Sequence, residues 1–248
     1  MHALNKTRVE LITQADYVLT DTELRALEQL FERRIQGEPI AYILGQREFF
    51  GLDFHVTPDV LIPRPDTELL VELSLRFAPP DSELLDLGTG SGAIAIAVAH
   101  QRPDLTVWAA DISPAALTIA RQNAATHHCP IHFIESDWYQ HLPARLWHTI
   151  VSNPPYIVAG DRHLTQGDLR FEPINALTDH ADGLSAYREL IAGAGKHLIS
   201  GGWLLFEHGY DQAQAVRDLL QSAQFQQVQS WQDIAGIERV SGGKFIPE

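Results

Sequence analysis

An α/β fold with a mostly parallel sheet is predicted for the larger, C-terminal part of this 248-residue chain. The main observation is that short apolar runs alternate with stretches of helical periodicity from Glu83 onward. Strands that alternate with helices are joined by right-handed crossovers, so the strands run parallel and helices cover both faces of the sheet. The length allows one large domain with a small appendage. We therefore expect ligands to bind at the carboxyl ends of the strands.

The first forty residues predict a partial helical layer. Apolar residues recur at helical spacing from Leu24, and Thr20 and Glu23 form a capping box that begins a helix of about four turns. Gly37 and Pro39 end this helix.

A hairpin and a linker are expected next. Residues 48–56 alternate apolar and polar side chains around Gly51, a pattern typical of a short hairpin. Prolines at positions 58, 63 and 65 then indicate a linker, after which Asp66 or Thr67 caps a helix that runs to about Phe77.

The remaining pattern assigns the main domain element by element. Strands are expected at 83–87, 106–111, 131–135, 149–152 and 203–207. Helices are expected at 92–100, 114–126, 185–199 and 212–223, and a final pair of strands at 225–231 and 239–246. The predicted organisation is a helical region at 1–45, a hairpin and linker at 46–75, and the main domain at 76–248.

Composition narrows the function classes. Eighteen Lys and Arg against 32 Asp and Glu give a net charge of −14, which repels phosphate backbones and argues against a direct nucleic-acid partner. No apolar run approaches the ~20 residues of a membrane span, and Met1-His2-Ala3 begins no signal peptide. A single cysteine, Cys129, excludes an internal disulfide and a cysteine metal cage. We expect a cytoplasmic protein with no metal and no membrane partner.

A glycine-rich turn follows the first strand of the main domain. Gly88, Thr89, Gly90, Ser91 and Gly92 lie between this strand and a helix. Glycines let the backbone approach a ligand, and the free N–H groups of a helix start favour electron-rich groups. The turn resembles a dinucleotide-binding pattern, but its spacing differs from the GxGxxG of a pyrophosphate site, so the turn alone is ambiguous. The alternative is a glycine-rich turn with no ligand.

Two further strand ends carry side chains suited to a nucleoside. Asp111 ends the second strand, where a carboxylate can accept hydrogen bonds from both ribose hydroxyls; the alternative is a helix cap ahead of Pro114. Asp137 and Trp138 follow the third strand and can contact an adenine, although a capping Asp beside a surface Trp fits nearly as well.

The fourth strand is followed by Asn153, Pro154, Pro155 and Tyr156. Two prolines remove two backbone donors and stiffen the loop, so the Asn153 side-chain oxygen and the Pro154 carbonyl can act together as acceptors. Paired acceptors match the two hydrogens of an NH₂ group. The alternative is a rigid turn with no ligand.

The glycine turn at 86–92, followed by NPPY at 153–156, resembles the S-adenosylmethionine-dependent methyltransferases that modify planar amino or amide nitrogens. Within that class the chain resembles the release-factor glutamine N5-methyltransferases. The supporting segments cover roughly residues 35–248 and lie at 42–49, 61–68, 86–92, 153–156, 171–177 and 207–209. This family implies a seven-stranded Rossmann-like methyltransferase sheet, a small N-terminal helical domain, shortened here at its start, and a hairpin between them.

The resemblance also implies roles for individual residues. The turn from Gly88 to Gly92 would line the methionine and ribose of S-adenosylmethionine, with Asp111 on the ribose and Trp138 beside the adenine. Residues 153–156 would hold the substrate glutamine, with Asn153 also near the cofactor and with Asn153, Pro154 and Tyr156 taking the catalytic roles. The product would be S-adenosylhomocysteine.

The implied substrate is the glutamine of the GGQ motif in class 1 peptide chain release factors. Two other activities would also require the NPPY loop to hold an NH₂ group. They are glutamine methylation of a ribosomal protein and N6 methylation of adenine in DNA or RNA. The motif chemistry does not separate them, and a non-catalytic nucleoside-binding module is a further alternative.

Overall fold

The computed structural model describes residue 4 and residues 6–247. The start of the predicted 1–45 region, including Met1-His2-Ala3, and the last residue of the main domain lie outside the described residues.

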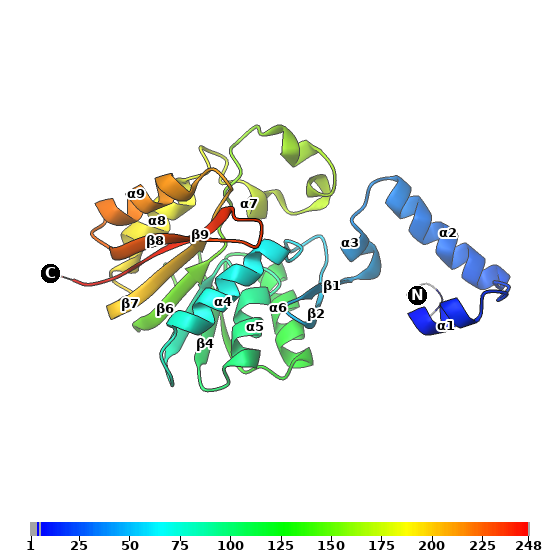
Figure 1. Ribbon diagram of the computed structural model, residues 1–248, viewed down its shortest axis with the longest axis horizontal. Helices are drawn as coiled ribbons and strands as arrows, with labels where there is room; N and C mark the ends of the chain where they lie inside the picture. The colour runs from blue at the N-terminus through cyan, green and yellow to red at the C-terminus, as the bar shows by residue number, and fades with distance from the viewer. Residues whose placement is uncertain (1–3, 5, 248) are drawn as a thin grey trace.

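In the described part of the chain, three α-helices precede the hairpin: α1 (Arg8–Thr13), α2 (Asp21–Ile35) and α3 (Ile40–Leu44). The expected capping box of α2 is confirmed, since the Thr20 hydroxyl accepts from the Glu23 N–H and the Glu23 carboxylate accepts from the Thr20 N–H. Figure 1 shows α1 and α2 extending away from the sheet, and neither contains a buried residue. Their apolar side chains therefore contribute little to the protein's core.

The expected hairpin is confirmed as β1 (Gln46–Phe49) paired antiparallel with β2 (Leu52–His55). It packs into the core through Phe49 and Phe54, whose rings meet edge to face at 6.0 Å. The Asn123 carboxamide fixes it in place, accepting from the His55 N–H at 2.8 Å and donating to the His55 carbonyl at 3.0 Å and the Ser91 carbonyl at 2.9 Å.

A seven-stranded sheet is present in the part of the chain that the structure describes, in the order β5-β4-β3-β6-β7-β9-β8. The first five strands in this order run parallel, and β9 is antiparallel to both β7 and β8. The predicted sheet is thus confirmed. Its strands are β3 (Glu83–Leu87), β4 (Thr106–Asp111), β5 (Ile131–Glu135), β6 (Trp147–Ser152), β7 (Leu198–Glu207), β8 (Gln226–Gln232) and β9 (Glu238–Lys244).

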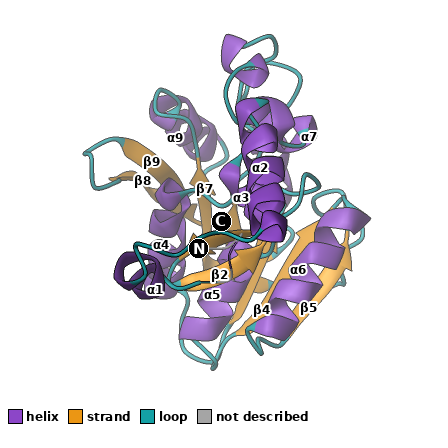
Figure 2. Cartoon of the chain, turned by 90° about the vertical axis from the view of Figure 1, so that its right-hand side faces the viewer, coloured by secondary structure: helices purple, strands orange, loops and turns teal. Residues whose placement is uncertain are grey.

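Helices cover both faces of this sheet. On one face lie α4 (Glu68–Phe77), α5 (Ala93–Gln101) and α6 (Pro114–Thr126), and on the other α8 (Ser185–Ala194) and α9 (Ala213–Ser222). Figure 2 shows α5 and α6 lying over β4 and β5. Within β3, Leu84 packs on the face covered by α4, α5 and α6, and Leu85 packs on the face covered by α8 and α9, because successive strand residues point to opposite faces.

Two expected details are wrong. The helix predicted at 185–199 ends at Ala194, with Gly195 at its C-cap, and β7 already begins at Leu198. Neither Asp66 nor Thr67 caps α4, because a short 3₁₀ turn (η2, Pro65–Thr67) leads into it without a side-chain cap.

The long segment between β6 and α8, residues 153–184, is called the excursion below. It contains the 3₁₀ turns η3 (Arg162–Thr165) and η4 (Leu169–Phe171) and the short helix α7 (Ile174–Leu177). An ion pair between Arg34 and Asp168 at 3.1 Å ties it to α2. Arg64 pairs with the buried carboxylate of Glu172, which also accepts from the Ile62 N–H at 3.0 Å. The excursion is thereby held against the linker that precedes α4.

Over the described stretch, the helices are too short or too polar to cross a membrane. Nor do three or more His, Cys, Asp or Glu side chains come together there in a group that could hold a metal ion.

Candidate active site

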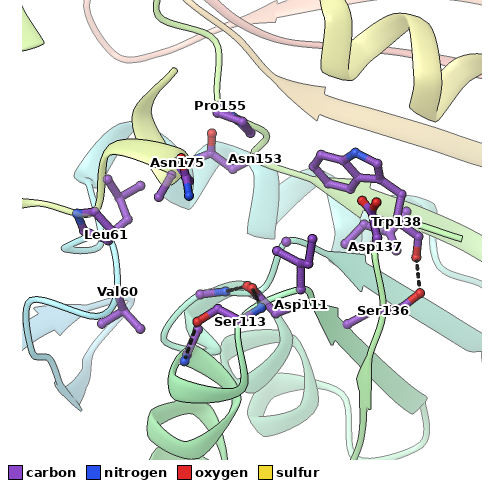
Figure 3. Close-up of a pocket in the computed structure, with 18 of the residues that line it drawn as sticks. Val60, Leu61, Asp111, Ser113, Ser136, Asp137, Trp138, Asn153, Pro155 and Asn175 are labelled. Atoms are coloured by element: carbon purple, nitrogen blue, oxygen red, sulfur yellow. Dashed lines mark hydrogen bonds between the residues drawn. The ribbon is translucent and has the colours of Figure 1, made fainter. Parts of the chain in front are cut away.

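A cavity of about 370 Å³ opens at the carboxyl ends of β3, β4 and β6. This volume lies within the ~300–1,000 Å³ usual for small-molecule sites. Figure 3 shows Val60 and Leu61 across the cavity from Asp137 and Trp138. The lining residues are Asp59, Val60, Leu61, Leu87, Gly88, Gly90, Ala110, Asp111, Ile112, Ser113, Ala116, Ser136, Asp137, Trp138, Asn153, Pro155, Pro173, Asn175 and Ala176.

The glycine turn forms one wall. Gly88 and Gly90 have φ of 73° and 55°, a left-handed conformation that side chains disfavour, and both line the cavity. Thr89 and Ser91 line a smaller adjoining cavity of about 50 Å³. Gly92 faces the helices: a Cβ there would lie 2.8 Å from Ile96 Cδ1 and 3.2 Å from the Ala120 Cβ, so its role in this structure is close packing.

Asp111 links the turn to the next strand end. Its Oδ2 accepts from the Gly90 N–H at 2.8 Å, and its Oδ1 accepts from the Ser113 N–H at 2.9 Å. Burial raises the pKa of this carboxyl, while backbone N–H donation from Ser113 and Gly90 acts in the opposite direction. The cap of α6 is Ser113, whose hydroxyl accepts from the Ala116 N–H. Asp111 is therefore not the N-cap of α6, which was the alternative interpretation of this residue.

Sequence reasoning missed Asp86, a fully buried carboxyl at the base of the turn. The Thr89 hydroxyl donates to its Oδ2 at 2.6 Å, whereas its Oδ1 has no hydrogen-bond partner among the described residues. Burial raises the pKa of Asp86 to about 7. An acidic residue inside an otherwise apolar strand was the signal that could have identified it.

Trp138 and Asp137 form the opposite wall (Figure 3). The indole lies beside Gly88, since a Cβ added to that glycine would be 3.4 Å from Trp138 Cζ3. The Ser136 hydroxyl donates to the Trp138 carbonyl at 2.8 Å and helps to hold this turn, in which Trp138 has φ of 44°. A flat ligand can pack against this indole.

Asn153 and Pro155 bring the NPPY loop to the cavity. The Asn153 Nδ2 donates to Thr67 Oγ1 at 3.3 Å. Pro154 is buried and is not among the residues that line the cavity. The Tyr156 carbonyl accepts from Gln212 Nε2 at 3.0 Å, and its ring packs against the core beneath α8 and α9. Substrate contacts of Pro154 and Tyr156 stay predictions.

The rest of the lining comes from segments that the sequence did not assign to the site. Val60 and Leu61 belong to the linker, and Pro173, Asn175 and Ala176 belong to the excursion. The Arg64–Glu172 pair draws these two segments together. Their proximity arises from contacts 108 residues apart in the chain, so only the resemblance at 61–68 and 171–177 pointed to these segments.

The described side chains thus combine a largely apolar cavity, a carboxylate acceptor at Asp111 and an amide on a proline-containing loop. This arrangement suits the binding of a nucleoside-bearing molecule and the positioning of a second, planar group beside it.

Comparison with known proteins gives concordant results. The family model of the methyltransferase small domain matches residues 65–168, and that of the PrmC N-terminal domain matches residues 1–45. The release factor glutamine methyltransferase of Burkholderia pseudomallei is 54% identical over 98% of this chain and 88% of that protein. The protein of the same name from Neisseria gonorrhoeae is 51% identical over 97% and 89%. The fold is similar to that of a methyltransferase from Pyrococcus furiosus, with a TM-score of 0.61 at 18% identity over 88% of this chain and 98% of that one.

Proposed function

The chain belongs to the release factor glutamine methyltransferase family, and we propose that it methylates N5 of the glutamine in the GGQ motif of class 1 release factors. The methyl donor is S-adenosylmethionine, and the product is S-adenosylhomocysteine. The observation that carries the proposal is that Asp111 and Asn153 line the same cavity. They come from the ends of two different strands, and one bound methyl donor could contact both.

The cavity fits the proposed methyl donor. Asp111 has a carboxylate at the wall for the ribose hydroxyls, Trp138 offers a flat apolar surface for the adenine, and Gly88 and Gly90 allow close backbone approach. When bound, S-adenosylmethionine supplies an electrophilic methyl group. The glycine turn and Asp111 would hold the methyl donor, and Asn153 lines the same cavity.

A glutamine amide is a poor nucleophile because its nitrogen lone pair is delocalised into the carbonyl. The Asn153 side-chain oxygen and the Pro154 carbonyl would accept the two N–H bonds and fix the nitrogen in line with the methyl group. Acceptors aimed at the nitrogen would also stabilise the positive charge that develops there as the nitrogen–methyl bond forms and the methyl–sulfur bond breaks. One N–H proton would then leave to water and restore a neutral amide. Proximity supplies much of the remaining rate.

We also place the enzyme in the cytoplasm, in agreement with the partly buried, unpaired thiol of Cys129.

The test is methylation of a purified release factor, followed by peptide mapping with mass spectrometry. We expect one methyl group on the GGQ glutamine. A ribosomal protein fraction and duplex DNA at low salt, where DNA binding is strongest, are offered in parallel. Methyl transfer to either of these and not to the release factor would contradict the substrate assignment.

A further inference from the structure

A second buried carboxyl lies beside the NPPY loop, outside the roles described so far. Glu207 is the last residue of β7 and is only 2% exposed. Ser152 pairs with Phe206 in the register of β6 and β7, so Glu207 emerges next to Asn153 at the same sheet edge. Its Oε2 is buried without a hydrogen-bond partner in the described part of the chain. A buried acceptor of this kind is costly to leave unused.

The surroundings of Glu207 contain two donors. The polar side chains of Thr67 and Asn153 lie close enough to Glu207 to favour its ionised carboxylate, and they so oppose the effect of burial on its pKa. Asn153 Nδ2 also donates to Thr67 Oγ1 at 3.3 Å. Thr67 and Glu207 therefore offer acceptors to the NH₂ end of the Asn153 carboxamide from two different elements, η2 and β7.

This matters because a carboxamide has two unlike ends. The oxygen only accepts and the nitrogen only donates, so a flipped Asn153 would present a donor to the substrate NH₂ and repel it. A carboxylate only accepts, and it therefore selects the nitrogen end.

We propose that Glu207 is a positioning residue which, together with Thr67, receives the Nδ2 end of Asn153 and so directs its Oδ1 end toward the substrate amide. The proposal rests on the proposed function for its consequence in catalysis. The orientation of Asn153 itself is a property of the free protein and does not depend on the proposed function.

The charge state of Glu207 makes this orientation depend on pH. Burial raises the pKa of Glu207 to about 7; Asp66 of η2 raises it further, and Arg239 of β9 lowers it. The other titratable groups facing Glu207 are the phenols of Tyr156 and Tyr187, and burial raises the pKa of both. Above pH 7 the carboxylate only accepts, whereas below it the carboxylic acid can donate to Oδ1 and permit the flipped Asn153.

The direct test is nuclear magnetic resonance of the protein labelled with ¹⁵N in asparagine. The chain has four asparagines, at positions 5, 123, 153 and 175, so the side-chain NH₂ signals are few. Asn153→Ala assigns the signal of interest. We expect this signal to shift with a midpoint near pH 7 in the wild type and to lose that titration in Glu207→Gln.

Glu83→Gln is the matched control. Glu83 is also a strand glutamate whose buried Oε2 has no hydrogen-bond partner among the described residues, while its Oε1 pairs with Arg145. It lies at the opposite end of the sheet, at the start of β3. We expect the Asn153 signal to titrate in this variant as in the wild type. A signal that is the same in wild type and Glu207→Gln at every pH would overturn the proposal.

Kinetics provide the second readout. Glu207→Gln should lower kcat roughly 10- to 100-fold while the affinity for S-adenosylmethionine stays within a few fold, because only the acceptor side is disturbed. The wild-type kcat should rise with pH through about 7, and this rise should be absent from the variant. Asp86 remains in both proteins, so its titration cannot produce the difference.

Thr67→Val removes the other acceptor and tests the same orientation if Glu207→Gln does not fold. A release factor that accepts no methyl group while the Asn153 signal titrates as expected would refute the proposed function alone. Unchanged kinetics and an unchanged signal in both variants would refute the role of Glu207.

Discussion

The two sides of the cavity are built in different ways. The glycine-turn side comes from one short segment and the strand next to it, with Asp111 bonded directly to the Gly90 N–H. The NPPY side depends on partners far away in the chain: Thr67 is 86 residues from Asn153 and belongs to another element. The first side is thus shaped mainly by backbone conformation, and the second by the register between distant elements. Substitutions should accordingly separate cofactor binding from turnover.

The largest effect is expected on the NPPY side. Asn153→Ala removes one preorganised acceptor and should lower turnover by about 10²–10³. Cofactor affinity, measured by calorimetry, should fall much less, since Asn153 is one of many lining groups. Turnover within a few fold of wild type would mean that the loop is only a rigid turn.

On the glycine-turn side, Asp111→Ala should act on the cofactor. A carboxylate that accepts from two hydroxyls contributes ~2–3 kcal/mol, so the affinity for S-adenosylmethionine should fall about 30- to 150-fold. The variant also loses the acceptor of the Gly90 N–H. Titration calorimetry measures the loss, and unchanged affinity would remove Asp111 from the site.

The next prediction concerns the pH dependence of stability caused by the buried carboxyl of Glu207 on the NPPY side. The pKa of Glu207 rises from 4.5 to about 7 on folding, so the folded protein holds the proton more tightly than the unfolded chain. Stability is therefore lost as the pH increases from about 4.5 to about 7. Glu207→Gln removes this cost and should raise the free energy of unfolding at pH 8 by about 1–3 kcal/mol.

Urea unfolding of Glu207→Gln and wild type at pH 5 and pH 8 measures this difference. The gain in stability should shrink toward pH 5, where wild-type Glu207 is protonated in the folded state. An equal gain at both values would show that Glu207 does not titrate near pH 7.

The smallest effect is expected away from the cavity, on helix α2. Phe31 on α2 is 59% exposed, so Phe31→Ala should change the free energy of unfolding by less than about 0.5 kcal/mol. Cofactor affinity should not change. Urea unfolding and calorimetry test this, and a loss of several kcal/mol would show that α2 packs against the main domain in solution.

The same contrast explains which features the sequence could predict. The bounds of β3, β4 and β5 and the presence of the hairpin agree with the sequence pattern, because hydrophobic periodicity and turn residues are local signals. Asp111 could be placed at a strand end for the same reason. The meeting of Glu207 with Asn153 could not, since it requires the pairing of β6 with β7. Glu172, paired with Arg64 at long range, was missed as a contact for the same reason.

The central claim is that the NPPY loop recognises a primary amide at a fixed position. It is tested most directly by methyl transfer to three forms of one release factor, carrying glutamine, asparagine or glutamate in the GGQ motif. We predict strong activity on glutamine and a loss of about 10² on asparagine, whose nitrogen is displaced by about 1 Å or more. We predict no detectable transfer to glutamate, which lacks the nitrogen nucleophile and which a site built around specific hydrogen bonds also rejects by ~10⁴ or more. The glutamate form therefore reports the position of the methyl group, and the asparagine form reports the geometry of the site. Equal methylation of the glutamine and asparagine forms would contradict the claim.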